Sequence, residues 1–245
     1  MCLAGTLMLG CDEDAITPTR KLRVEAMSHG EFHYRIIRYD ERNRISELIN
    51  GTIDETEDSV ESVYHVFYKG NVIERISSED ETHVYEYTYH KGSILESREF
   101  VDHHLQVLNE FYYNASGQVD VWVTKQAAGD VLVPLNRRAY RYDASGNAVS
   151  MELENYDPLT KGHVLVSTTK FLKFDDKKNS GSLFLNHDNP YHIQFRNNAR
   201  TWRVENTNGM VGETHFTYEY NAEGYATSQR DLAGALEIKY QFVPY

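Results

Sequence analysis

Two clusters of histidine and aspartate have side chains that could bind a metal ion. His187, Asp188 and His192 stand together in the segment HDNPYH, and residues 101–104 read VDHH. Imidazole nitrogen and carboxylate oxygen are ligands that zinc and other transition metals take in proteins. Neither segment has the ligand spacing of a zinc motif. The first cluster is a metal-site hypothesis, and chance clustering of the 11 histidines is the alternative for both.

The sequence contains no recognisable motif for nucleophilic or acid–base catalysis. The sequence has no Gly-x-Ser-x-Gly elbow, and its two cysteines, Cys2 and Cys11, fall within the first eleven residues. Acidic runs occur at 54–58 (DETED) and 79–81 (EDE), but charge runs of this kind are typical of solvated turns. A glycosidase needs two carboxyl groups about 5–10 Å apart in a cleft. The sequence therefore predicts no catalytic residue and no cofactor, with a glycan hydrolase that uses unidentified paired carboxylates as the alternative.

The two tryptophans are candidates for ligand binding. Trp122 lies in the strand pattern opposite the alternating valine row that begins at Val119, beside Asp120 and Thr124. Alternate residues of a strand point to opposite faces, so this position predicts an exposed ring. Trp202 is the second candidate. Such rings could stack on a sugar or on a partner's apolar surface, whereas the alternative is that they belong to an inner face.

A short aromatic phrase recurs along the chain and must build the elements that position these residues. It reads YRYDASG at 140–146, FYYNASG at 111–117 and YEYNAEG at 218–224, with a drifted copy, RYDERN, at 38–43. Asp143 suits the first position of a type I turn, and Gly146 falls where the chain needs a positive φ. In the drifted copy Asn43, a residue that tolerates this conformation, replaces the glycine. Each phrase predicts a strand end followed by a hairpin turn with a bulge.

The segments between these turns alternate with a period of two residues. HVYEYTYH at 83–90 and ALEIKYQF at 235–242 place aromatic or aliphatic residues on one face and polar residues on the other. This alternation is typical of half-buried strands. The sequence therefore predicts an all-β fold, a long antiparallel meander of hairpins that forms a curved sheet or an open or closed barrel.

Composition limits the classes of protein that the chain can belong to. The formal net charge of −12 argues against nucleic acid, whose phosphates require a basic surface. The turn phrases run from about Arg38 to Tyr220 without a Pro/Ser-rich linker. We therefore expect a single repeat-built domain over residues 21–245, preceded by a separate segment over residues 1–20.

The first twenty residues have the pattern of an export signal. MCLAGTLMLG is an apolar run that ends in Gly10 directly before Cys11, and acidic residues follow at 12–14. LMLGC resembles the lipobox of bacterial lipoproteins, and the acidic residues resemble the surface-export signal of Bacteroidetes lipoproteins. The resemblance implies lipidation of Cys11, whose acyl chains would anchor the protein to the outer membrane. The barrel would then face the cell surface or the periplasm; the alternative is a disordered or buried N-terminal strand.

The repeated turn is similar to the tyrosine–aspartate repeats of large secreted shell proteins, with the strict match at Tyr142–Gly146. Together with the lipobox and the acidic leader, it resembles a Bacteroidetes lipoprotein family of unknown function with a porin-like antiparallel fold. This resemblance covers the chain from about Arg38 onward. It implies a porin-like barrel, but it implies no activity and carries over no functional residue.

Charged residues on the strands argue against a barrel embedded in lipid. Glu86, Arg141 and Glu219 occupy the face opposite the aromatic rows, and hydrocarbon does not tolerate such charges. We therefore expect membrane contact through the lipid anchor alone; the alternative is a small membrane barrel whose tyrosine rows face lipid and whose charged face lines an aqueous lumen. The sequence predicts a non-enzymatic, envelope-anchored lipoprotein that binds or scaffolds an extracellular ligand or partner, either a carbohydrate or another envelope protein.

Overall fold

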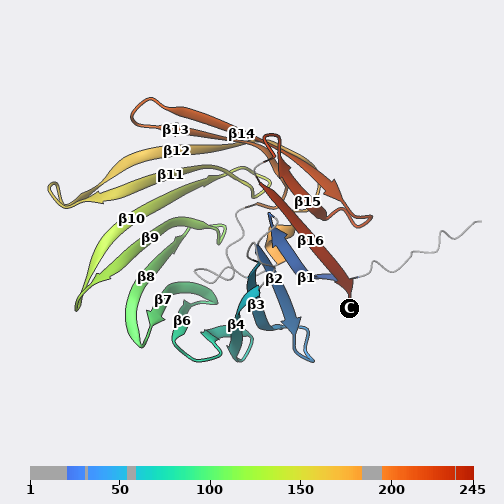
Figure 1. The fold of residues 1–245 in the computed structure, drawn as a ribbon. Coiled ribbons are helices and arrows are strands. Elements are labelled where there is room, and N and C mark those ends of the chain that lie inside the picture. The colour runs from blue at the N-terminus through green and yellow to red at the C-terminus, as the bar shows by residue number, and fades with distance from the viewer. Residues whose placement is uncertain (1–20, 31–32, 54–58, 184–194, 235) are drawn as a thin grey trace, which may run out of the picture.

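The structure is a computed structural model that describes residues 21–30, 33–53, 59–183, 195–234 and 236–245. Over these ranges the chain is all-β, and its antiparallel strands form a closed sixteen-stranded barrel (Figure 1). A short 3-10 helix, η1 (Ser180–Leu183), lies within the ring of strands. The predicted antiparallel meander is confirmed, and of the predicted alternatives the closed barrel is the one that forms.

The strands follow one another around the barrel in chain order. They are β1 (Leu22–His29), β2 (His33–Tyr39), β3 (Ile45–Ile53), β4 (Ser59–Lys69), β5 (Val72–Ser78), β6 (His83–His90), β7 (Ser93–Val101), β8 (His104–Tyr113), β9 (Val119–Ala128), β10 (Val131–Tyr142), β11 (Ala148–Asp157), β12 (Gly162–Phe174), β13 (Ala199–Asn206), β14 (Val211–Tyr220), β15 (Ala226–Asp231) and β16 (Glu237–Pro244).

The barrel closes between its first and last strands. β1 pairs antiparallel with β16, from Leu22 opposite Pro244 to His29 opposite Ile238. Closure removes the two free edges that an open sheet would expose. The start of β1 and the finish of β16 therefore lie at the same end of the barrel. The turns after β2, β4, β6, β8, β10 and β14 lie at this end too. We call this the turn end, and we call the opposite end the mouth.

The turns at the turn end have the geometry that the sequence phrase predicts. In one turn the Asp143 carboxylate accepts the amide of Asn147 at 2.9 Å, and Gly146 has φ +89°. In the drifted copy Asp40 accepts the amide of Arg42 at 2.9 Å, and Asn43 takes the positive φ of +57°. A one-residue register shift follows each of six such turns, at positions 46, 74, 95, 120, 149 and 227.

Tyrosine hydroxyls tie neighbouring strands together at the turn end. Each of these tyrosines ends or nearly ends an even-numbered strand and donates to a carbonyl on the preceding odd-numbered strand. Those two strands are joined by a hairpin at the mouth. The bond therefore holds them together at the turn end, where no hairpin connects them. We call these bonds the tyrosine clamps: Tyr39 to Val24 (2.7 Å), Tyr68 to Ile45 (2.9 Å), Tyr89 to Ile73 (2.5 Å), Tyr113 to Ile94 (2.8 Å), Tyr142 to Val119 (2.9 Å) and Tyr218 to Ala199 (2.8 Å).

The two faces of the sheet differ in chemistry. The inner face holds a continuous apolar core that runs from Val24 on β1 through Phe111 on β8 to Ala199 on β13. The outer face carries ion pairs between neighbouring strands, which include Arg38–Glu47, Lys125–Glu110, Arg137–Glu154, Arg141–Glu152 and Lys170–Glu205. Exposed pairs contribute little stability individually. Their position shows that charged side chains lie on the outer face of strands around the barrel.

Removing one clamp hydroxyl tests the clamps. The substitution Tyr142→Phe deletes the donor to the Val119 carbonyl and leaves that buried acceptor without this bond. We expect the free energy of unfolding in urea to fall by about 1–2 kcal/mol. The control is Tyr112→Phe, which removes a hydroxyl from a residue on β8 that is 52% exposed. Equal effects of the two substitutions would contradict a structural role for the clamp.

The clamps also predict alkaline sensitivity. Burial raises the pKa of the clamp residue Tyr39 from the ordinary value of 10.0 to about 12, and burial also raises the pKa of the clamp residues Tyr142 and Tyr218 above the ordinary value. A phenol whose pKa is higher in the folded state stabilises the fold fully below pH 10, and this contribution is lost as the pH rises through 12. Circular dichroism should therefore report loss of the sheet between pH 10 and 12. A sheet signal unchanged at pH 12 while tyrosinate absorbance is complete would contradict this.

Candidate functional site

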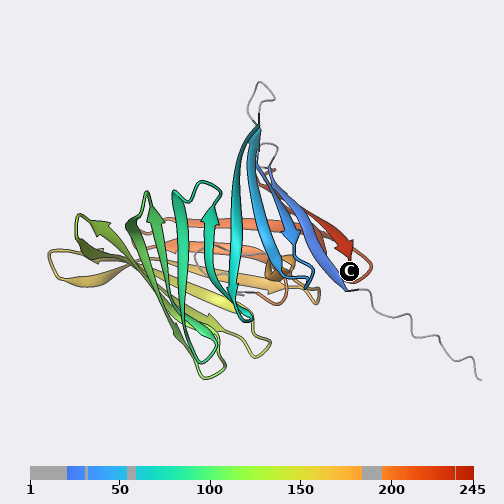
Figure 2. The same ribbon diagram turned by 90° about the horizontal axis from the view of Figure 1, so that it is seen from below.

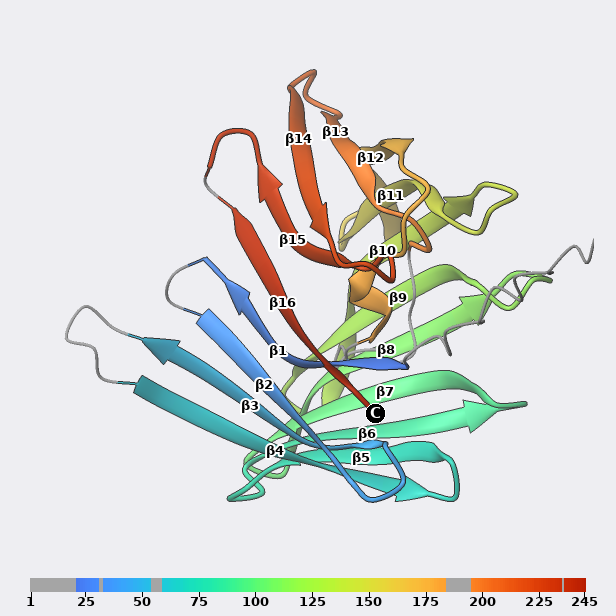
Figure 3. The same ribbon diagram turned by 90° about the vertical axis from the view of Figure 1, so that its right-hand side faces the viewer.

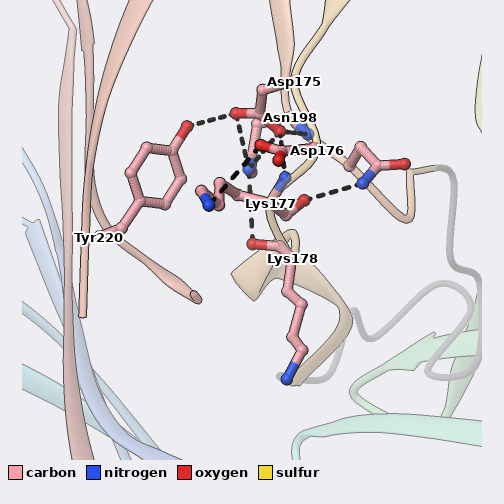
Figure 4. Close-up of polar contacts among 7 residues, drawn as sticks. Asp175, Asp176, Lys177, Lys178, Asn198 and Tyr220 are labelled. Atoms are coloured by element: carbon pink, nitrogen blue, oxygen red, sulfur yellow. Dashed lines mark hydrogen bonds and ion pairs between the residues drawn. The ribbon is translucent and has the colours of Figure 1, made fainter. Parts of the chain in front are cut away.

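The hairpin repeat is broken between β12 and β13. The amide of Asp175 donates to the Asn198 carbonyl at 3.1 Å, as the amide of Asp143 donates to the carbonyl of Asn147 in an ordinary turn. The Asp175 carboxylate also accepts the amides of Lys177 at 3.0 Å and Asn198 at 3.1 Å (Figure 4). The backbone hydrogen bond that closes the usual turn is thus retained between Asp175 and Asn198. Residues 176–197 replace the three residues that an ordinary turn has between these two positions.

The Asp175 carboxylate is held by further donors. The side-chain amide of Asn198 donates to both carboxylate oxygens at 3.2 Å, and the Tyr220 hydroxyl donates to Oδ2 (Figure 4). Burial, together with the hydrogen bond to Asp175, raises the pKa of Tyr220 above its usual value. A carboxylate engaged by this many donors serves as the anchor of the inserted segment.

The described parts of the inserted segment pack into the interior near the turn end. Ser180 in η1 donates to the Ala226 carbonyl on β15 at 2.5 Å. The ring of Phe195 lies 4.8 Å from Phe171 and 6.4 Å from Trp202, measured between centroids. The described part of this connection therefore packs against the core at the turn end. The predicted metal ligands His187, Asp188 and His192 belong to the same insertion but lie outside the described residues, so that site stays a prediction.

Trp202 belongs to this inner aromatic cluster. Its ring makes edge contacts with Phe171 at 5.6 Å and with Phe216 at 5.0 Å. Its indole nitrogen is buried and has no hydrogen-bond partner within the part of the chain that the structure describes. The expectation of an exposed ring does not hold at this position, because Trp202 packs among three phenylalanines. Ligand binding by Trp202 stays a prediction.

The expected exposure of Trp122 is wrong. The residue is 6% exposed and belongs to the inner core. The reason is the register shift at Asp120, which places Val119 opposite Tyr113 but Val121 opposite Tyr112. A bulge adds one residue and exchanges the faces of everything beyond it. Val119 and Trp122 consequently share the inner face, which simple alternation cannot predict.

Inner-face polar residues hold Trp122 in place. Its indole N–H donates to Asn109 Oδ1 at 2.8 Å, and the Thr124 hydroxyl donates to the same oxygen at 2.9 Å. The Arg138 guanidinium lies 4.9 Å from the centre of the Trp122 ring. Asn109 is 3% exposed and Thr124 is 7% exposed. This network is satisfied by its own members, which indicates a structural role.

Along the inner rows the residues change from apolar to polar toward the mouth. On β2 the row runs from Ile37 through Arg35 to His33, and on β4 it runs from Val66 through Tyr64 to Ser62. Residues two apart share a face of the strand, so each row continues the core wall into polar groups. This gradient was a signal in the sequence that alternation analysis missed.

A groove lies at the mouth over β1–β6, and we call it the mouth groove. It consists of two cavities, one of about 340 Å³ beside Arg35 and Asn50 and one of about 580 Å³ beside Tyr64 and His83. Both are lined by Ser62, so they adjoin each other. Figure 2 shows that β3 and β4 extend beyond the shorter β5 and β6 at this end of the barrel. Figure 3 shows the same strands from the side.

Three side chains form a chain of hydrogen bonds at the back of the larger cavity. His83 Nε2 lies 2.7 Å from Glu99 Oε1, and His83 Nδ1 lies 3.0 Å from the Tyr64 hydroxyl. The Tyr85 hydroxyl donates to the same Glu99 oxygen at 3.3 Å. Burial, followed by the negative charge of Glu99, raises the pKa of Tyr64. The arrangement fixes the orientation of His83 at the groove surface.

The second histidine cluster, residues 101–104, lies where β7 ends at Val101 and β8 begins at His104, with a two-residue turn between them. Asp102 and His103 there have φ values of +48° and +65°. Within the described ranges no group of three or more histidine, cysteine, aspartate or glutamate side chains is placed to hold a metal ion. In the same ranges, no helix is long and apolar enough to cross a membrane.

Comparison with known proteins identifies the fold. No protein-family model matches the sequence, and no curated protein matches it. Among solved structures, a porin-like protein from Bacteroides uniformis is similar with a TM-score of 0.62 and 12% identity, covering 90% of this chain and 98% of that one. A porin-like protein from Bacteroides vulgatus has a TM-score of 0.61 and 14% identity, covering 91% and 99%. The fold is therefore porin-like, as the sequence resemblance implied; at this identity the likeness concerns the fold alone.

Substituting the anchoring carboxylate tests the account of the inserted segment. Asp175→Ala removes the acceptor for the amides of Lys177 and Asn198 and for the Tyr220 hydroxyl. Because hydrogen bonds to charged groups are stronger than neutral ones, we expect the free energy of unfolding to fall by about 2–3 kcal/mol. The neighbouring exposed carboxylate gives the control, since Asp176→Ala should change it by less than about 0.5 kcal/mol. Equal effects would contradict the anchor.

Proposed function

We propose that the protein is a bacterial envelope lipoprotein that binds a small polar ligand in the mouth groove of a barrel surrounded by water, without catalysing a reaction on it. The observation that carries the proposal is the pair of adjoining cavities lined by Arg35, Asn50, Tyr64 and His83. Binding sites are concave and combine a few oriented polar groups with aromatic surface. The mouth groove has these features.

The outer face supports a barrel that does not contact lipid. Its cross-strand ion pairs lie on strands as far apart as β2, β9, β12 and β15, so they surround the barrel. A membrane barrel needs an outward apolar band, and charges within that band are destabilising. The porin-like fold is thus used here with the charge pattern of a protein in water.

The polarity of the barrel supports a mouth that is open to the surroundings. Leu22 begins β1 at the turn end, so the segment that contains Cys11 joins the barrel there. Acyl chains on Cys11 would place the turn end toward the membrane and the mouth away from it. A ligand could then reach the mouth groove without crossing the bilayer.

Mass spectrometry of the protein extracted from its native envelope tests the anchor. We expect a mature chain that begins at Cys11 and carries acyl chains. The substitution Cys11→Ala should abolish the acyl mass, whereas Cys2→Ala should leave it unchanged, because Cys2 lies in the removed leader. An unmodified chain that begins at Met1 would contradict the lipoprotein assignment.

Filling the groove tests ligand binding. Ser62 is exposed and lines both cavities, so Ser62→Trp should occupy the groove with little loss of stability. Thr217→Trp on exposed β14 is the matched control. We expect at least one of maltopentaose, pentaglycine, citrate and spermidine to bind wild type and Thr217→Trp alike in calorimetry, and Ser62→Trp to bind it at least tenfold more weakly. Equal binding by all three proteins, or binding of none of the four probes, would contradict the proposal.

A further inference from the structure

The described lining residues of the two halves of the mouth groove differ in charge, although the Glu61 carboxylate of the larger cavity also accepts the hydroxyl of Tyr34, which lines the smaller one. The smaller cavity is lined by Arg35, His29 and His33, and none of its described lining residues is a carboxylate. The larger cavity is lined by Glu61, Glu79 and Asp80, and no lysine or arginine is among its described lining residues. A groove with this distribution of charge favours a ligand whose own charges are separated in the opposite sense.

Donors converge in the smaller cavity. Arg35 lies on the inner face of β2, where its Nε donates to Asn50 Oδ1 at 2.6 Å, which fixes the plane of the guanidinium. His29 and His33 stand opposite each other across β1 and β2, with ring centroids 6.4 Å apart. Burial lowers the pKa of the Arg35 guanidinium. A planar, oriented guanidinium suits a carboxylate.

Acceptors converge in the larger cavity. Asp80 Oδ1 accepts the Ser78 hydroxyl at 2.6 Å and the Thr82 hydroxyl at 2.8 Å, which holds the carboxylate in the β5–β6 turn. These bonds keep the pKa of Asp80 below its ordinary value, so it stays ionised. Glu79 is its exposed neighbour in the same turn. This half suits an ammonium group.

We propose that the ligand of the mouth groove is a short zwitterionic peptide, with its carboxylate beside Arg35 and its ammonium group beside Asp80 and Glu79. The proposal rests on the proposed binding function and adds the class of ligand. The separation of the two halves sets the length. From β2 to β5 there are three strand spacings, roughly 14 Å, and an extended chain covers about 3.3–3.6 Å per residue. Peptides of four or five residues therefore match the groove.

Calorimetry with glycine peptides of two to six residues tests the class and the length, because glycine supplies the two end charges without side chains. We expect binding to be tightest for tetraglycine or pentaglycine. N-acetylation or C-amidation of pentaglycine should each weaken binding at least tenfold. Equal affinity of the free and blocked peptides would overturn the proposal.

A pair of charge-neutralising variants tests the acidic half. Glu79→Gln with Asp80→Asn keeps the turn, since asparagine retains the acceptor oxygen, and should weaken pentaglycine binding at least tenfold. In this variant N-acetylation should have no further effect, because the partner charges are already absent. Glu41→Gln with Asp176→Asn removes the same charge from exposed residues at the turn end. This control should bind like wild type, and an equal loss in both variants would overturn the assignment of the ammonium site.

The neutral probe separates this proposal from the binding function on which it rests. If maltopentaose binds, Ser62→Trp abolishes that binding and the glycine peptides do not bind, the zwitterion is overturned and the groove stands as a site for neutral sugars. If pentaglycine binds wild type and Ser62→Trp equally, both proposals are overturned. Pentaglycine binding that is lost in Ser62→Trp and in the acidic-half variant supports both.

Discussion

The bond from a strand-end tyrosine to a carbonyl of the preceding strand is the interaction on which the barrel depends. A hairpin fixes the register of its two strands at the connected end, and twist tends to separate them at the other end. The six tyrosine clamps act at that other end, as Tyr142 does toward Val119. At the end of β12 the corresponding residue is Phe174, which has no hydroxyl, and there the insertion replaces the turn. Asp175 and Tyr220 provide the substitute connection. The clamps thus tie neighbouring strands together at the turn end. Strand length and side-chain chemistry can therefore vary more at the mouth.

Local chemistry was predictable from the sequence, and long-range pairing was not. The positive φ at Asn43 and at Gly146, and the aspartate bonds in the turns, follow from the conformational preferences of single residues. Closure of the barrel depends on β1 meeting β16, some 220 residues later, which no local pattern encodes. The environment of Trp122 was mispredicted because one bulge residue, Asp120, reverses the faces. The mouth groove was missed because its residues come from six strands and become neighbours after pairing fixes their register.

The two faces of the barrel wall differ in chemistry. The outer face carries ion pairs between neighbouring strands, while the inner face is apolar near the turn end and polar near the mouth. A sixteen-stranded barrel is too wide to be filled by wall side chains alone, which is why porins enclose a channel. Here the inserted segment packs against Phe171 and Trp202 and occupies part of that width. The base of the barrel thus holds the described part of the inserted segment, and its mouth is polar.

Spin labelling measures most directly whether the outer wall of the barrel contacts water or lipid. Thr88 on β6 and Thr217 on β14 are exposed residues of the outer face on different sides of the barrel, and the sequence has no cysteine after Cys11. A nitroxide attached to cysteine at either position should be relaxed strongly by a water-soluble nickel chelate and weakly by oxygen. Relaxation dominated by oxygen at both positions would place the wall in lipid and would contradict a barrel surrounded by water.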